Sequence, residues 1–215
     1  MSSSTSQPTG GGSSMVLRHR LPDRLLHWST AVCIFILLGT GLLPVVGLRF
    51  EWVTIHWIAG LVMFLLIGLH VFRVVLRNRM LGIWFGMKDL RIVRSYLSKA
   101  SASMLKPGKY SPAQKLMHLG VTLLTMTTIL SGFLMMVRID TPFWERNIYL
   151  LSDEVWGLIY VLHGLASLCL VTTIMLHIYF SLRPEKWMYL RSMLKGWVTP
   201  EELEKLHNKE EWAGD

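Results

Sequence analysis

The amino-acid sequence predicts an all-α integral membrane protein, built as a bundle of four transmembrane helices. Of its 215 residues, 52% are hydrophobic and only 17% are charged, which is too apolar for an ordinary soluble surface. Four windows contain no Asp, Glu, Lys or Arg, and each exceeds the ~20 residues that a helix needs to cross a ~30 Å hydrocarbon layer. The windows are Leu25–Leu48, Trp52–Phe72, Leu116–Val137 and Val155–Leu182.

The windows also define how the chain is divided. A segment within lipid must satisfy its own backbone hydrogen bonds, and these windows are too long and too uniformly apolar to be the strands of a barrel. We therefore expect one membrane domain over residues 18–195. Its spans lie at about 25–48, 52–76, 113–137 and 155–182. Residues 1–17, which are rich in Ser, Thr and Gly, are predicted to be disordered, and residues 196–215 to form a cytoplasmic tail.

Basic residues are distributed unequally between the two sides of the predicted bundle. Ten Lys and Arg residues lie between Arg73 and Lys115, and six lie between Arg183 and Lys209, whereas the two short connections carry few. The positive-inside rule therefore places both termini and the long middle connection in the cytoplasm. Because these cations gather where helix ends meet anionic headgroups, the net charge of +8 does not indicate a nucleic-acid partner.

Histidines inside the spans are the candidate functional residues, because ionisable groups in a membrane are costly and usually have a function. His56 and His70 are fourteen residues apart in the second span, and His163 and His177 have the same spacing in the fourth. Fourteen helical steps return to within roughly 40° of the starting direction and rise about 21 Å. Each helix therefore presents two histidines on one face, one near each membrane surface.

This arrangement predicts two haem groups, each held by two axial imidazoles from facing helices. His56 and His163 share the outer level. His70 and His177 share the inner level, where His27 and His118 also lie, so the inner haem has more candidate ligands than it needs.

A faint internal duplication accompanies these histidines. Gly41 and Gly132 each follow a histidine by fourteen residues, so that the two halves of the domain resemble each other. No CxxCH motif is present, which excludes covalent c-type haem, and no nucleotide-binding or hydrolase motif appears.

Several stretches together resemble the di-haem cytochrome b subunits of respiratory formate dehydrogenases (the gamma subunit) and nickel-iron hydrogenases. They are Asp23–Trp28, His56–Gly60 and Lys109–Lys115, completed by the pair His163 and His177. The resemblance extends from about residue 24 to residue 195.

The resemblance implies a set of ligands for two haem b groups. In that family His56 and His163 correspond to the outer pair, and His27 and His177 to the inner pair. Spacing alone favours His70 for the inner position, so His70 stays as the alternative partner of His177. The resemblance also implies a quinone site for menaquinone or ubiquinone near the inner haem, with Ser111 and Gln114 as candidate contacts.

The function implied is that of a membrane-anchoring electron carrier in the bacterial inner (cytoplasmic) membrane. Its partners would be an iron-sulfur subunit on the periplasmic side and a catalytic dehydrogenase subunit, and its electrons would pass to quinone. Two alternatives stay open. One is a free-standing di-haem quinol oxidoreductase that passes electrons outward, and the other is a non-haem transporter or anchor with functional intramembrane histidines.

Overall fold

Four long helices form the body of the structure, a computed structural model that describes residues 15–76, 84–97, 106–208 and 212. All four are long and apolar enough to cross a membrane. They are α1 (Leu21–Leu42), α2 (Trp52–Leu76), α4 (Pro112–Met136) and α5 (Asp153–Leu182). The predicted all-α fold with four spans is therefore confirmed. Of the segment predicted to be disordered, residues 1–14 lie outside the described residues.

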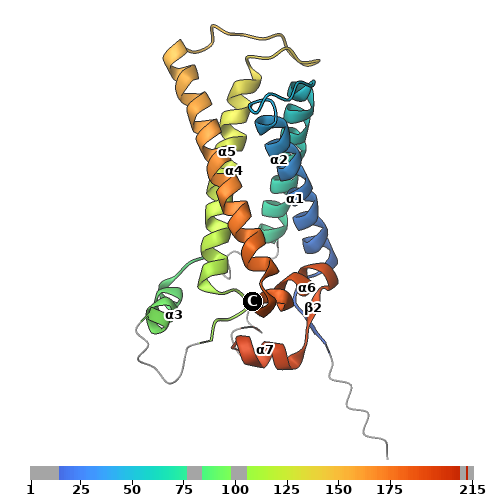
Figure 1. The fold of residues 1–215 in the computed structure, drawn as a ribbon, viewed down its shortest axis with the longest axis vertical. Coiled ribbons are helices and arrows are strands. Elements are labelled where there is room, and N and C mark those ends of the chain that lie inside the picture. Colours follow the sequence, from blue (N-terminus) through green and yellow to red (C-terminus); the bar gives the residue numbers. More distant parts are fainter. Residues whose placement is uncertain (1–14, 77–83, 98–105, 209–211, 213–215) are drawn as a thin grey trace, which may run out of the picture.

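The four helices are arranged as two hairpins. Helix α1 packs closely against α2, and α4 packs closely against α5, whereas the contacts between the two hairpins are sparse (Figure 1). We call the end with the two short connections, residues 43–51 and 137–152, the loop end. The opposite end, where the remaining elements lie, is the cap end.

Proline and local capping decide where the helices begin and end. Helix α1 ends at Leu42, six residues before the expected end of the first span, because Pro44 has no backbone N–H with which to continue the helical hydrogen bonds beyond Leu43. Gly47 then turns the chain with a φ of 96°, a conformation open to glycine. At the cap end, Ser111 caps α4, with Pro112 in the first helical turn.

Few side chains are buried between the four long helices. In the most apolar window of each span, only 11–17% of the residues are buried inside the protein. The buried side chains include Met63 and Trp156, each 1% exposed. Most of the helix surface is therefore available to lipid or to a bound group rather than to other protein atoms.

Helix α3 (Met87–Leu97) lies beside the cap end. It falls within residues 83–105, where apolar and aromatic residues are mixed with basic ones, a pattern that predicts an amphipathic stretch on the membrane surface. It is tied to the bundle by an ion pair of 3.1 Å between the Lys115 Nζ atom and the Asp89 Oδ2 atom. Residues 83 and 98–105 of the predicted stretch lie outside the described residues.

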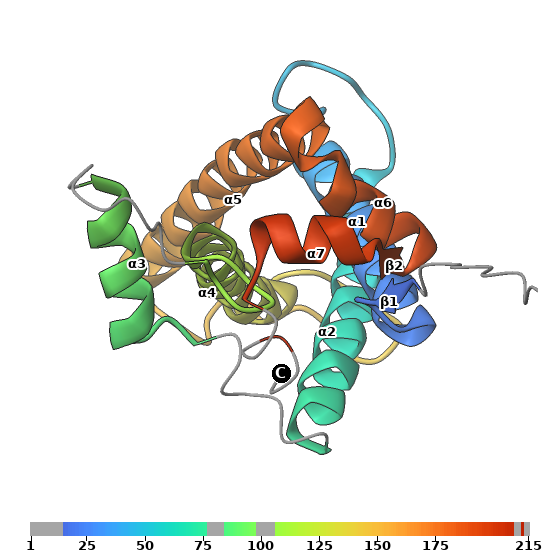
Figure 2. The ribbon, with the colours of Figure 1, turned by 90° about the horizontal axis from the view of Figure 1, so that it is seen from below.

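The cap end is built from both ends of the described chain. It contains β1 (Val16–Leu17), a 3-10 turn (Pro184–Lys186), α6 (Trp187–Lys195), β2 (Trp197–Val198) and α7 (Pro200–Leu206). Strands β1 and β2 pair in antiparallel fashion. Helix α7 crosses the end of the bundle, as Figure 2 shows, and its Leu203 is buried.

Arg18 is at the centre of this cap and is only 3% exposed. Its guanidinium donates to the Lys109 carbonyl over 2.7 Å and lies 4.8 Å and 4.9 Å from the ring centroids of Tyr189 and Trp212. The Nε2 atom of His207 is 3.4 Å from the Arg18 Nη1 atom. One cation thus joins four separate segments of the chain.

His207 makes the stability of this cap depend on pH. Its Nδ1–H donates to the Gly108 carbonyl over 2.6 Å, which leaves Nε2 as an acceptor beside Arg18. Burial, together with the charge of Arg18, lowers the pKa of His207 from 6.5 to about 4. As the pH falls from about 6.5 to about 4, the unfolded cap binds a proton that the folded cap does not, so the cap loses stability.

We expect acidification to release residues 200–208, seen as lower amide protection factors at pH 4.5 than at pH 7, once the slower intrinsic exchange in acid is taken into account. His207→Gln keeps a donor for Gly108 but cannot charge, so its protection factors should depend less on pH. Some dependence will persist, because burial and Arg18 also lower the pKa of His19 to about 3. An unchanged pH dependence in His207→Gln would contradict this assignment.

Candidate functional site

Six histidines from the four long helices face one another in three pairs. At the loop end, the ring centroids of His56 and His163 are 6.2 Å apart. At the cap end, His27 and His177 are separated by 6.3 Å, and so are His70 and His118. Within the described part of the chain, no cluster of three or more His, Cys, Asp or Glu side chains comes together as a metal site.

The separation of the rings identifies the kind of metal ligation that each pair fits. Two imidazoles on opposite sides of one metal ion, with bonds of about 2.0 Å, place their ring centroids roughly 6.3 Å apart. Two imidazoles on a tetrahedral ion would lie only roughly 5.2 Å apart. All three pairs therefore fit trans ligation, which is how two axial histidines hold the iron of a flat macrocycle.

The structure also shows which histidines meet at the cap end. His27 faces His177 across the seam between α1 and α5, whereas His70 faces His118 across the seam between α2 and α4. The pairing of His70 with His177, which spacing alone favours, is thus not the one brought together here.

Hydroxyl groups orient both imidazoles of the loop-end pair. The Thr40 hydroxyl donates to the Ile36 carbonyl over 2.7 Å, so it accepts from the Nδ1–H of His56 over 2.8 Å. The Ser131 hydroxyl likewise donates to the Thr127 carbonyl over 2.6 Å and accepts from the Nδ1–H of His163 over 2.9 Å. Both imidazoles then carry their proton on Nδ1, which leaves the lone pair of Nε2 available to a metal ion.

Comparison with known proteins decides the family. Residues 18–196 match the family described as prokaryotic cytochrome b561. The chain belongs to this family. A relative of this cytochrome b is the formate dehydrogenase cytochrome b556 subunit of Haemophilus influenzae. It is 24% identical over 208 residues, which cover 89% of this chain and 80% of the relative.

These matches confirm the resemblance identified in the sequence. A cytochrome b uses haem b, and the paired histidines supply the donors that haem b requires. Together with the four apolar helices, membership in a prokaryotic cytochrome family makes the chain a multi-pass bacterial membrane protein.

The two glycines of the duplication lie against the loop-end histidines of this cytochrome. A Cβ atom added at Gly41 would lie 3.5 Å from His56 Cε1, and one added at Gly132 would lie 3.4 Å from His163 Cε1. A methyl group at either position would therefore be in van der Waals contact with the imidazole ring. Gly60 and Gly164 are different, since an added Cβ atom would meet nothing within 4 Å.

Thr40 and Ser131 are further candidate site residues, which the spacing of the histidines does not predict. Each directly precedes the glycine of its half of the duplication, so the signal was a hydroxyl residue repeated in the same place. Nothing in spacing alone shows that this hydroxyl accepts from a histidine on the neighbouring helix.

We expect Thr40→Val to raise the reduction potential of a haem at the loop-end pair and to weaken its retention by about tenfold. Without the acceptor at Nδ1–H, His56 is a less basic ligand and stabilises ferric iron less. Redox titration of the purified protein checks this result.

Thr172→Val is the matched control, because the Thr172 hydroxyl bonds only to the Leu168 carbonyl of its own helix. An unchanged potential in Thr40→Val, or an equal shift in the control, would contradict a role for the hydroxyl.

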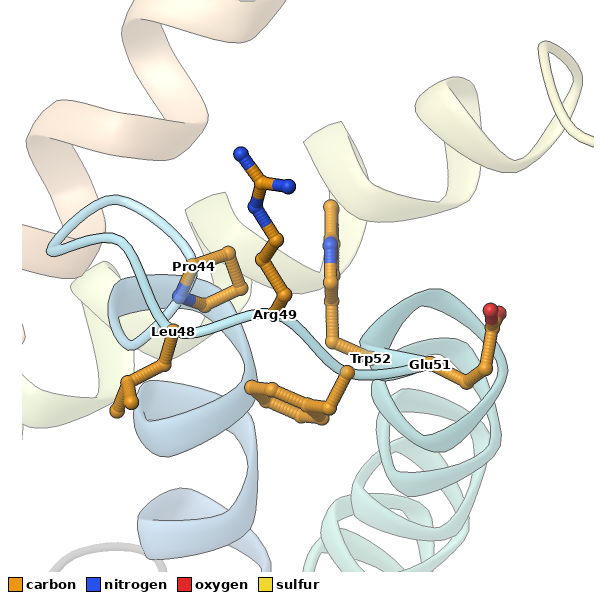
Figure 3. Close-up of a pocket in the computed structure, with 6 residues that line it drawn as sticks. Pro44, Leu48, Arg49, Glu51 and Trp52 are labelled. Carbon is orange, nitrogen blue, oxygen red and sulfur yellow. The ribbon is translucent and has the colours of Figure 1, made fainter.

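A shallow pocket of about 500 Å³ opens at the loop end beside this site. It is lined by Pro44, Leu48, Arg49, Phe50, Glu51 and Trp52. Figure 3 shows the side chains of Arg49 and Trp52 extending in the same direction from the connection between α1 and α2. The Trp52 ring is also 6.1 Å from the ring of His56, in an edge-on arrangement. Trp52 therefore joins the pocket to the loop-end pair.

Ser111 and Gln114, the candidate quinone contacts, lie at the cap end in the first turn of α4. They form a reciprocal capping box, in which the Ser111 N–H donates to Gln114 Oε1 over 2.9 Å and the Gln114 N–H donates to Ser111 Oγ over 3.3 Å. Their hydrogen bonds therefore stabilise the start of the helix that carries His118.

Proposed function

We propose that the chain is the membrane-anchoring di-haem b cytochrome subunit of a respiratory oxidoreductase of formate dehydrogenase or hydrogenase type. In this proposal it carries electrons from an iron-sulfur partner subunit across the membrane to quinone. The observation that carries it is the placement of His56 with His163 and of His27 with His177 at opposite ends of the same four spans, each pair at the separation of trans ligands.

The chain's own residues would provide ligation, orientation and an apolar setting. His56 and His163 would hold one haem b, with Thr40 and Ser131 fixing the imidazole orientation. His27 and His177 would hold the other. Haem b supplies reversible one-electron redox chemistry when bound, and the surrounding helices exclude water and tune its potential.

The proposed orientation of the chain in the membrane rests on the distribution of basic residues. Basic residues concentrate in the segments that form the cap end, so this end would face the cytoplasm and the loop end the periplasm. The iron-sulfur subunit would then dock at the loop end, where Trp52 links the surface pocket to His56, and a catalytic dehydrogenase subunit would complete the complex in the inner membrane. The name of the Haemophilus relative supports a role as a formate dehydrogenase subunit.

Quinone, either menaquinone or ubiquinone, would accept the electrons at the cap end. Ser111 and Gln114 stay candidate contacts for it, beside their role in capping α4. Membership in a cytochrome b family favours this function over a non-haem transporter or anchor.

Optical spectroscopy tests the proposal. The purified protein should show the sharp bands of reduced b-type haem in a reduced-minus-oxidised spectrum. Adding a water-soluble quinone analogue to the dithionite-reduced protein, freed of excess dithionite, should reoxidise these haems. A protein without b-type bands would refute haem binding, and reduced haem that quinone leaves unchanged would refute electron delivery to quinone.

A further inference from the structure

The pair formed by His70 and His118 has no role in a di-haem function, yet it has the geometry of the other two pairs. We propose that these two residues are the axial ligands of a third haem b, held in the seam between α2 and α4. This inference rests on the proposed binding of haem at the other two pairs and extends it by one site.

The two hairpins repeat each other residue by residue. In their first helices, His27 and Thr40–Gly41 correspond to His118 and Ser131–Gly132, with a constant offset of 91 positions. In their second helices, the offset is 107 positions, so that His56 corresponds to His163 and His70 to His177.

Packing follows the same repeat. Ala59 and its counterpart Ala166 are 8% and 5% exposed, and Met63 and its counterpart Leu170 are 1% and 5% exposed. The hydroxyl of each hairpin bonds to the loop-end histidine of the same hairpin, over 2.8 Å in one and 2.9 Å in the other. The two hairpins are therefore equivalent in structure as well as in sequence.

The equivalence of the hairpins can be applied to each histidine pair by replacing both members with their counterparts in the other hairpin. The loop-end pair then gives itself, because His56 and His163 are each other's counterparts. The cap-end pair of His27 and His177 is converted into the pair of His118 and His70. The two cap-end pairs indeed match, with ring centroids 6.3 Å apart in both and interplanar angles of 56° and 49°.

Direct contact between the imidazoles does not account for this separation. An N–H···N hydrogen bond of about 2.9 Å would bring two imidazole centroids to roughly 5.2 Å. A tetrahedral metal ion would give a similarly short separation. The 6.3 Å between the ring centroids of His70 and His118 is instead the separation that two imidazoles on opposite sides of one metal ion would have.

The seams between the hairpins are compatible with a flat group. Helices α1 and α5, and likewise α2 and α4, make few backbone contacts compared with the two helices of each hairpin. Both cap-end pairs lie across these sparse seams. A macrocycle between α2 and α4 would thus not require two tightly packed helices to separate.

Cations are placed where the carboxylates of a haem would need them. Arg24 and Lys115 occupy corresponding positions, one helical turn before His27 and His118. At the second seam Arg73 also follows His70 by three residues, and its guanidinium contacts Asp23 over 2.5 Å. Arg24 donates to the Met193 carbonyl and Lys115 pairs with Asp89, so both basic side chains would change partners to meet the carboxylates of a haem.

Haem counting tests the inference on the purified full-length chain. The pyridine haemochrome assay, combined with amino-acid analysis for protein, should give three haem b groups per chain. His118→Ala should reduce this number to two, as should His70→Ala. Leu119→Ala is the matched control, because its exposed side chain is adjacent to His118 and is not a ligand, so it should retain three.

His118→Met keeps the test valid if the alanine variants fail to assemble. Methionine is an axial ligand of haem iron, so this variant should retain three haems, one of them with a raised potential. Two haems per chain in the wild type, unchanged by His118→Ala, would overturn the third site and leave the proposed function intact. A wild-type protein without haem would overturn both.

Discussion

His163→Ala is expected to remove the loop-end haem completely and to leave haem at the cap end in place. In the proposed site His56 and His163 are the two ligands of the loop-end haem, so the variant would retain one ligand instead of two. The cap-end pair of His27 and His177 shares only helix α5 with the lost ligand. Haem content should therefore fall by one per chain.

The variant should lose one of the two ways in which haem at the cap end can be reduced. Dithionite should still reduce the haem that remains at the cap end, whereas electrons from the proposed iron-sulfur partner at the loop end should no longer reach it. Leu162→Ala is the matched control, since Leu162 is an adjacent exposed side chain, and it should behave like the wild type. Loss of every haem in His163→Ala, with the control intact, would show that the two sites are not independent.

Arg18→Ala is expected to unfold the cap while the four spans stay in the membrane. The buried guanidinium donates to the Lys109 carbonyl and lies over the rings of Tyr189 and Trp212. A charged hydrogen bond and a desolvated cation–π contact together contribute about 3 kcal/mol or more. The variant should expose residues 197–208 to limited proteolysis.

Arg18→Lys distinguishes the contribution of the positive charge from that of the planar guanidinium group. Lysine keeps the cation but lacks the planar fork that reaches several partners at once, so an intermediate rate of cleavage is expected. Haem content should be unchanged in both variants, because Arg18 contacts none of the six paired histidines. Wild-type resistance to protease in Arg18→Ala would contradict the central role of this residue.

The spans could be predicted from sequence because lipid imposes a strong constraint on composition. A window without charge and longer than a bilayer is thick has few alternatives to a helix. Composition is less informative about helix ends, since Leu43–Leu48 is as apolar as the helix before it. The end of α1 depends instead on the backbone chemistry of Pro44.

The sequence predicted how deep each histidine lies in the membrane, but not every pair of histidines that face each other. A spacing of fourteen residues fixes how far apart two histidines lie along a helix, and this placed His56 with His163. Which helix stands opposite His70 is a property of the bundle, and α4 rather than α5 provides its partner, His118. The family resemblance supplied the pairing of His27 with His177 that spacing could not.

The structure of the cap could not be predicted from local sequence patterns. Its central contacts join Arg18 to Lys109, Tyr189 and His207, which are separated along the chain by up to 189 positions. No periodicity or motif connects these segments, and an arginine near a span is ordinarily a headgroup contact. Only the folded structure shows that this one is buried.

The sparse seams between the two hairpins have a consequence for biogenesis. Each hairpin closes its own backbone bonds and packs its own two helices, so it can insert as a separate unit. Few contacts join the spans of one hairpin to those of the other, and the cap adds protein contact at one end only. Ligands from both hairpins on a shared iron would then act as the cross-link that completes assembly. Cells starved of haem should accumulate a newly made chain whose halves are inserted but unjoined, and quality-control proteases should degrade it faster than the mature cytochrome.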